Sequence, residues 1–370
     1  MSKSNQIWVG LDVHKESVSI AAFREGEARP IHQERLGPSD EALRRVLRRL
    51  SREGSVRACY EAGGFGYVLQ RKLAAWGYAC DVVAPSLIPR KPGDHVKTDR
   101  RDALKLAEYN RSGHLTYVYV PTPEDERWRS VVRARRAFQK DTHRVQQRIL
   151  KLLQARGHFY REEGKHWSQK FMHWLADLPL AEDDRFLIGS YTAQRDMQLQ
   201  LAQGVVARIE TLIEHKRWGK PMGRLQCLRG VDLLTSSSLV VEIVDIERFA
   251  GPRELMGWAG LGVTEFSSGE HVSRDRITKS GNSEVRRLMI EAAWNNTHPP
   301  RIGEPLRRRL EGQDPAVVAH AWRAQQRLHD TWRRLGPRSP KLAATAMARE
   351  MLGFVYALWR ARPEDLQSRS

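Results

Sequence analysis

The sequence predicts an α/β domain, then a long coiled-coil-like helical arm, then a mainly α-helical C-terminal domain. Short β-branched runs alternate with amphipathic helical patterns as far as Pro121, which is typical of a sheet covered by helices. A helical pattern then covers 123–157 without a break, and helical patterns dominate the remainder. We therefore expect domain boundaries at 1–121, 122–220 and 221–370.

The first domain is expected to contain a mixed sheet. Its predicted strands are the short apolar or alternating runs 7–12, 15–23, 32–36, 55–62 and 78–85. Its predicted helices have apolar residues at helical spacing and cover 38–53, 66–77 and 99–112. The first of these helices has Ser39 or Asp40 as its N-cap. This order predicts a sheet that packs against helices.

The predicted helix 123–157 is longer than the helices of most single domains. Acidic residues occupy its first turn, and it has no internal glycine or proline before Gly157 ends it. Its length indicates a coiled-coil-like arm, against which a second helical stretch at about 185–217 can fold back. Spacing alone gives equal support to a solvated, charged helix.

The C-terminal domain begins with predicted helices within 224–261, joined by short turns that contain glycine. The segment 228–249 resembles a helix-hairpin-helix, in which the turn at Gly230 exposes backbone N–H groups at the start of the next helix. Such a helix start can bind phosphate, so Gly230 is a candidate contact to a DNA backbone. A plain helical hairpin explains the same pattern equally well.

The charge of the chain points to a polyanionic partner. Lys and Arg number 62 against 44 Asp and Glu, which leaves a formal charge of +18. Nucleic acid is the first candidate partner and an anionic membrane surface the second. We expect no membrane-spanning helix and no secretion signal, because the sequence has no long apolar run and its N-terminal segment has no apolar core. The three cysteines form neither a disulfide framework nor a zinc motif, so a reducing cytoplasm is the expected location.

Four acidic residues are placed where they can share one site. Asp12 and Glu61 stand at the ends of the first and fourth predicted strands, and Asp99 and Asp102 are three residues apart in the first turn of a helix. If the two strands are neighbours, these carboxylates converge and need a cation between them. Mg²⁺ prefers oxygen ligands, and two such ions roughly 3.5–4 Å apart stabilise an in-line phosphoryl displacement.

Basic residues surround the helical pair of acids. Lys97, Arg100 and Arg101 are therefore candidate contacts to the phosphate that reacts. Any single acid at a helix N-terminus is more simply explained as a cap or a dipole partner, and only the whole arrangement favours a metal site. His14 follows Asp12 closely and is a candidate neighbour of the metal ligands, but a lone histidine at a strand end is usually structural or exposed to solvent.

The motifs GLDVHK, YEAGG and VKTDRRDA resemble those of the DEDD-type insertion-sequence transposases of the IS110 family, which includes the Piv-like DNA invertases. The resemblance implies a RuvC-like, RNase H-type N-terminal domain. Motif by motif, it assigns the metal-binding and catalytic acids to Asp12, Glu61, Asp99 and Asp102. The implied metal is Mg²⁺, with Mn²⁺ as its substitute.

A second block, at 257–294, resembles the C-terminal motif of the same family, which contains a Ser-(Ser/Thr)-Gly followed by Lys-x-Gly-Asn and an arginine. In the family this serine attacks a DNA phosphodiester and forms a covalent phosphoserine. The resemblance assigns the nucleophile to Ser267, with Ser268 as the alternative, since adjacent serines leave the register open. Candidate partners of the developing phosphorane charge are Lys279, Arg286 and Arg287. Thr264 and Arg276 depart from the family pattern, which has proline and glycine there.

The resemblance implies a site-specific DNA recombinase that moves its own insertion element. It implies donor and target DNA, an element-encoded guide (bridge) RNA, and a homodimer or homotetramer as partners. Two alternatives stay open. A metal-dependent endonuclease like a Holliday-junction resolvase would use the acids without a covalent intermediate, and the serine block argues against it. A non-catalytic DNA- or RNA-binding protein would need no metal, and the four acids argue against that.

Overall fold

The computed structural model describes residues 5–89, 99–161, 164–268 and 271–367. The chain divides into two compact units, Met1–Pro121 and Thr122–Ser370, and each is described by itself. The further division of the second unit into an arm and a C-terminal domain stays a prediction.

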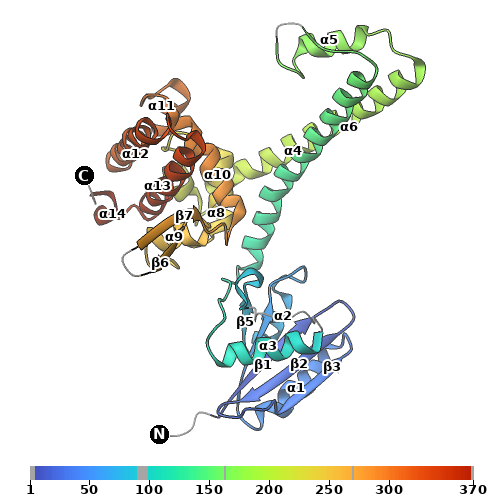
Figure 1. Ribbon diagram of the computed structural model, residues 1–370, viewed down its shortest axis with the longest axis vertical. Coiled ribbons are helices and arrows are strands. Elements are labelled where there is room, and N and C mark those ends of the chain that lie inside the picture. The colour runs from blue at the N-terminus through green and yellow to red at the C-terminus, as the bar shows by residue number, and fades with distance from the viewer. Residues whose placement is uncertain (1–4, 90–98, 162–163, 269–270, 368–370) are drawn as a thin grey trace. The chain divides into compact units, whose positions relative to one another are not determined.

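A five-stranded mixed sheet forms the centre of the first unit (Figure 1). Its strands are β1 (Gln6–Val13), β2 (Val18–Arg24), β3 (His32–Leu36), β4 (Ser55–Glu61) and β5 (Ala79–Val83). Their order is β3-β2-β1-β4-β5, with β1–β2 and β2–β3 antiparallel and β1–β4 and β4–β5 parallel. This confirms the predicted mixed sheet, and it makes β1 and β4 neighbours with the same direction.

Helices cover both faces of this sheet. The helices are α1 (Asp40–Ser51), α2 (Val68–Ala75) and α3 (Asp99–Arg111), with a short 3-10 turn η1 (Pro85–Leu87). Ser39 is the N-cap of α1, since its side chain accepts a hydrogen bond from Ala42 N. Alternate residues of β1 pack with α1 and α2, while α3 packs on the opposite face against β2. Two hydrophobic layers therefore hold the sheet.

Two long helices of the second unit lie side by side, and we call this pair the arm (Figure 1). They are α4 (Pro123–Ala155) and α6 (Glu182–Glu210), and the shorter α5 (Gln169–Asp177) lies between them in sequence. Thr122 and Asp125 form a reciprocal capping box at the start of α4. The predicted fold-back of a second helix is confirmed. The helix α5 was not predicted, and its Phe171 is fully buried against the far end of the arm.

The rest of the second unit is mainly helical around a single large core. Its elements are η2 (Thr211–Glu214), α7 (Gly219–Leu225), α8 (Leu233–Ile243), α9 (Pro252–Trp258), β6 (Val263–Ser268), β7 (His271–Ile277), α10 (Ser283–Ala293), η3 (Trp294–Thr297), α11 (Glu304–Leu310), α12 (Pro315–Leu335), α13 (Pro340–Arg360) and α14 (Pro363–Gln367). The antiparallel hairpin β6–β7 was not predicted from the sequence. None of the helices in the described ranges combines the length and apolar character needed to cross a bilayer.

The predicted helix-hairpin-helix differs in position from the observed helices. Only α8 lies within 228–249, and the helix before the turn is α7, which ends at Leu225. Gly230 has a φ of 88°, and a Cβ there would lie 2.4 Å from the carbonyl oxygen of Ala292. Backbone packing therefore explains this glycine, and a phosphate contact at Gly230 stays a prediction.

Candidate active site

Two of the expected acids and one histidine converge where β1 ends. Asp12 is the penultimate residue of β1, and Asp99 is the first residue of α3. Nε2 of His14 lies 3.1 Å from Asp12 Oδ2 and 3.4 Å from Asp99 Oδ1. One potential ligand atom of each residue lies within 4.8 Å of the other two. His14, for which the sequence favours a structural or solvent-facing role, is therefore part of the cluster.

Gly10 allows α3 to approach β1 closely enough to form this cluster. A Cβ at Gly10 would lie 2.2 Å from the carbonyl oxygen of Ala103 and 2.4 Å from the backbone nitrogen of Ala107. No side chain fits there, so the backbone of α3 packs directly on β1. This contact holds the first turn of α3, which carries Asp99 and Asp102, beside the end of the strand.

Replacing Gly10 by alanine is expected to lower the free energy of unfolding of the first unit by about 2 kcal/mol, because α3 must move away from β1. The same shift should move Asp99 away from Asp12 and His14. Calorimetry of the full chain measures this as a lower melting temperature for the first unit only. Gly37→Ala is the matched control, since a Cβ at Gly37 meets nothing within 4 Å. An unchanged melting profile for the Gly10 variant would show that the close contact does not hold α3.

The electrostatics of Asp12 reflect a crowded, half-enclosed site. Burial raises the pKa of Asp12 above its ordinary value, and the negative charges of Asp99 and Asp102 act in the same direction. The hydrogen bond and charge of His14 offset part of this rise. Asp102 is thus near enough to act on Asp12, as its i, i+3 spacing from Asp99 predicts. A cation bound here would relieve the same repulsion.

Glu61 reaches the expected strand end but not the cluster itself. It is the last residue of β4, and the register pairs Leu11 with Tyr60, so Glu61 follows at the level of Asp12. The residue is exposed. Within the described part of the chain, no hydrogen bond or ion pair joins its carboxylate to Asp12, His14 or Asp99. The neighbouring strands agree with the sequence-based expectation, while a ligand role for Glu61 stays a prediction.

An arginine from the third strand also reaches the cluster. Arg35 lies 3.7 Å (Nη2 to Oδ2) from Asp99 and donates a hydrogen bond to Ser17 Oγ. The register explains its place, because Asp12 pairs with Ser19 and Ser19 pairs with Arg35 across the antiparallel strands. No sequence pattern marks Arg35, since only the strand order places it near the acids.

Of the basic residues predicted around the acids, the structure describes two. Arg100 and Arg101 lie in the first turn of α3 and are exposed, so a phosphate backbone can reach them. The backbone carbonyl of Arg100 accepts a hydrogen bond from Gln33. Lys97 lies outside the described residues. Contacts of these side chains to nucleic acid stay predictions.

The residues of the cluster fit a small divalent cation. Carboxylate oxygens suit Mg²⁺ and Mn²⁺, and an imidazole nitrogen adds a donor that suits Mn²⁺ better than Mg²⁺. Burial raises the pKa of Asp12 and the charges of Asp99 and Asp102 add to the rise, so a bound cation would offset a cost that His14 relieves only in part. Asp12 and Asp99 are therefore the residues that would hold a metal, with His14 in reach. Asp102 is near enough for its charge to act on Asp12.

The predicted nucleophiles lie on the β6–β7 hairpin of the second unit. Ser267 and Ser268 are the last two residues of β6, and they pair with Val272 and His271 of β7. A strand therefore carries the serines. The two departures from the family pattern lie opposite each other at the base of this hairpin.

Thr264 and Arg276 are hydrogen-bonded to each other where the strand pairing of the hairpin is irregular. The register shifts between Val263 and Glu265, and the hydroxyl of Thr264 donates to the carbonyl oxygen of Arg276 at 2.8 Å. The hydroxyl oxygen of Thr264 also accepts from the backbone N–H of Arg276 at 3.2 Å. The threonine side chain thus satisfies backbone groups that the bulge leaves unpaired.

The basic residues near the hairpin have different surroundings. Lys279 is exposed and has a φ of 56°, which is uncommon for a residue other than glycine. Arg286 donates from Nη1 to the carbonyl oxygen of Ala259 at 2.9 Å. Arg287 pairs with Glu284 and Glu291 on its own helix. Phosphate contact stays a prediction for all three basic residues and is better supported for Lys279, because both arginines have partners within the chain.

Comparisons with known protein families give matches in both units. A family model for DEDD transposases of the IS110 type matches residues 9–156. A second model, described as the transposase IS116/IS110/IS902 family, matches residues 222–305. The first match contains the acid cluster, and the second contains the β6–β7 hairpin.

Two relatives are similar along nearly their whole length. The chain is 38% identical over 361 residues to y4qE of Sinorhizobium fredii, a candidate transposase by its name, with 96% of this chain and 89% of the relative covered. It is 30% identical over 342 residues to the transposase for insertion sequence element IS1533 of Leptospira borgpetersenii, with 91% and 99% covered.

Proposed function

The chain belongs to the IS116/IS110/IS902 family of transposases, and from that premise we propose that it is a site-specific recombinase which moves its own insertion element. As a transposase it cleaves DNA and transfers DNA strands. The proposal adds how it does so: acids and a metal from the RNase H-like first unit act together with a serine from the second unit. The carrying observation is the cluster of Asp12, His14 and Asp99.

The first unit is proposed to hold the metal and activate the reaction. A DEDD domain implies a divalent cation, and Mg²⁺ or Mn²⁺ bound here supplies Lewis-acid stabilisation of the phosphoryl oxygens. Asp12 and Asp99 would hold the cation, and Asp102 and Glu61 would complete the acid set. His14 keeps Asp12 and Asp99 oriented by its contacts to both. The exposed Arg35 is placed to neutralise the phosphate that enters.

The second unit is proposed to supply the nucleophile. The hydroxyl oxygen of Ser267, or of Ser268, attacks the phosphorus of a phosphodiester and loses its proton to a base. The bond from phosphorus to the leaving deoxyribose oxygen breaks, and that oxygen takes up a proton. Attack by a deoxyribose hydroxyl of the other DNA then re-forms a phosphodiester and frees the serine. The energy of the broken bond is kept in the phosphoserine, so no nucleotide cofactor is needed.

The partners are proposed to be donor DNA, target DNA and a structured guide RNA encoded by the element. The formal charge of +18 supports binding to several polyanions, since phosphate contacts dominate such affinity. If a guide RNA pairs with the target DNA, base pairing provides most of the sequence recognition and protein contacts provide little of it. We place this activity in the cytoplasm, where the element's DNA lies, with no role for a membrane.

A homodimer or homotetramer is proposed because two DNAs must be joined. Supporting this, α6 has large apolar side chains that are exposed in the single chain. These are Phe186, Leu187, Met197, Leu199 and Leu201, with exposures from 37% to 72%. Exposed apolar groups of this size favour contact with another protein surface.

A reconstituted reaction tests the proposed function. The full chain, donor and target DNA, RNA transcribed from the element's flank and Mg²⁺ should give recombined DNA. A scrambled RNA and replacement of Mg²⁺ by Ca²⁺ are the controls, and both should abolish the product. Exchange that proceeds equally with scrambled RNA would remove the guide from the proposal. Cleavage without exchange would favour the resolvase-like endonuclease instead.

A further inference from the structure

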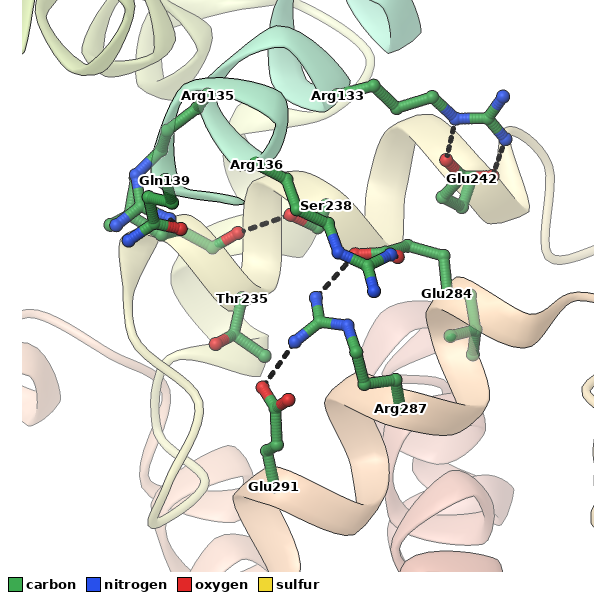
Figure 2. Close-up of polar contacts among 12 residues, drawn as sticks. Arg133, Arg135, Arg136, Gln139, Thr235, Ser238, Glu242, Glu284, Arg287 and Glu291 are labelled. Atoms are coloured by element: carbon green, nitrogen blue, oxygen red, sulfur yellow. Dashed lines mark hydrogen bonds and ion pairs between the residues drawn. The ribbon is translucent and has the colours of Figure 1, made fainter. Parts of the chain in front are cut away.

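A buried carboxylate joins the arm to the rest of the second unit. Glu242 lies on α8 and is 3% exposed. Arg133 of α4 donates to both of its oxygens, from Nε at 2.6 Å and from Nη2 at 2.8 Å (Figure 2). Arg129, one turn earlier on α4, lies 3.9 Å from Oε2 through Nε. The carboxylate thus receives a bidentate ion pair from the arm.

A further partner of Glu242 comes from another part of the chain. Asn282 donates from Nδ2 to Oε2 of Glu242 at 2.9 Å. Burial alone would raise the pKa of Glu242, but the hydrogen bonds from Arg133 and Asn282 and the charges of Arg133 and Arg129 outweigh it and lower the pKa. The group therefore stays ionised. A buried ion pair of this kind contributes little net stability to the fold. The role of Glu242 therefore lies in the groups that it orients.

Asn282 stands at the base of the hairpin that carries the serines. Its backbone N–H donates to the carbonyl oxygen of Trp258 at 2.9 Å. Its Oδ1 accepts from the backbone N–H groups of Glu284 and Val285 and so caps α10. One side chain therefore contacts Glu242 through its nitrogen and fixes the start of α10 through its oxygen.

Backbone hydrogen bonds close to Asn282 join the residues after β7 to the residues before β6. Thr278 N donates to Gly262 O at 2.8 Å, and Lys279 N donates to Gly260 O at 3.1 Å. Gly281 has a φ of 116°, and a Cβ there would lie 2.0 Å from the carbonyl oxygen of Trp258. The turn that ends β7 is thus tightly packed against the residues that precede β6. A shift of Asn282 would be transmitted to both strands.

We propose that Glu242 is a positioning residue that sets the orientation of the β6–β7 hairpin from the arm. The contacts run from Arg133 through Glu242 to Asn282 and from there to the base of the hairpin. The proposal rests on the proposed function, in which Ser267 or Ser268 attacks DNA. It predicts that Glu242 acts on the rate of attack after DNA has bound, since errors of about 1 Å in placing a nucleophile can cost roughly 10²-fold.

Three variants separate positioning from stability. Glu242→Gln places an amide nitrogen opposite a donor of Arg133 or Asn282, and Asn282→Asp places two carboxylates against each other. In the double variant, the amide introduced on α8 can donate to the carboxylate introduced at the start of α10, while its oxygen still accepts from Arg133. Aspartate also caps a helix well, so the start of α10 is kept. The double variant should therefore restore the link that each single variant breaks.

Hydrogen exchange of the full chain without nucleic acid is the first measurement. Each single variant should speed exchange in β6, β7 and Thr278–Asn282 about tenfold or more, while α12 and α13 stay as in the wild type. The second measurement is phosphoserine adduct formed per bound DNA, which should fall about 10- to 100-fold with DNA affinity unchanged. The double variant should recover most of both losses.

Glu291→Gln is the matched control. It removes a different ion pair of the second unit, that of Glu291 with Arg287, without changing Glu242 or Asn282 (Figure 2). It should leave hairpin exchange and adduct yield unchanged. Faster exchange throughout the second unit with unchanged adduct per bound DNA would overturn the positioning role. If the wild type forms no adduct, the proposed function fails, whereas hydrogen exchange still tests the link.

Discussion

Asp12→Asn is expected to lower DNA strand cleavage by about 10³-fold while DNA binding changes little, because the variant keeps the shape of the side chain but loses a charged metal ligand. The folded protein should tolerate the change. Burial raises the pKa of Asp12 in the fold, so the ionised carboxylate costs more free energy there than in the unfolded chain, and a neutral amide relieves this cost. The melting temperature should stay the same or rise slightly.

Cleavage of labelled donor DNA and Mn²⁺ binding by calorimetry measure this prediction. The matched control is Asp81→Asn, which changes an aspartate of β5 that pairs with Arg57 at 2.7 Å and not with the cluster. The control should retain cleavage and Mn²⁺ affinity. Normal cleavage by the Asp12 variant would rule out the acid cluster as the centre of the reaction.

Ser267→Ala is expected to reduce strand exchange by about 10³-fold or more if Ser267 is the nucleophile, since removing a covalent nucleophile leaves only binding and transition-state stabilisation. Ser268→Ala then has a much smaller effect. If Ser268 is the nucleophile instead, Ser268→Ala shows the large loss and Ser267→Ala the small one. The proposal requires one of the two variants to be inactive. DNA affinity and metal binding should stay near the wild-type values in both.

Rates of strand exchange for both serine variants, measured beside Ser280→Ala, check this prediction. Ser280 lies in the turn after β7, is exposed and has no role in the proposed chemistry. Its variant should exchange strands at the normal rate. Wild-type rates in both Ser267→Ala and Ser268→Ala would leave the metal centre as the sole catalyst and support the resolvase-like alternative.

The acid site could be predicted in large part because it depends on local patterns. Strand ends place Asp12 and Glu61, and helical spacing places Asp99 with Asp102. The parallel pairing of β1 with β4 then puts the two strand ends side by side. Sequence patterns of period 2 and 3.6 carry this information directly.

The features that the sequence did not reveal depend on long-range contacts. Gly10 has its reason only in the backbone of α3, and Arg35 reaches Asp99 only through the register of β3 with β2. In the sequence His14 is a lone histidine, because the position of Asp99 beside it is set by the fold. Glu242 has no neighbour in sequence that marks it, since its partners are 109 and 40 residues away.

The central claim is that one protein joins a metal centre to a serine that bonds covalently to DNA. The most direct test is to stop the reconstituted reaction with denaturant, digest the protein and identify by mass spectrometry the peptide that is linked to nucleotide. A phosphodiester on Ser267 or Ser268 should be present in the wild type and absent from Asp12→Asn. Cleaved DNA without any nucleotide-linked peptide would contradict it.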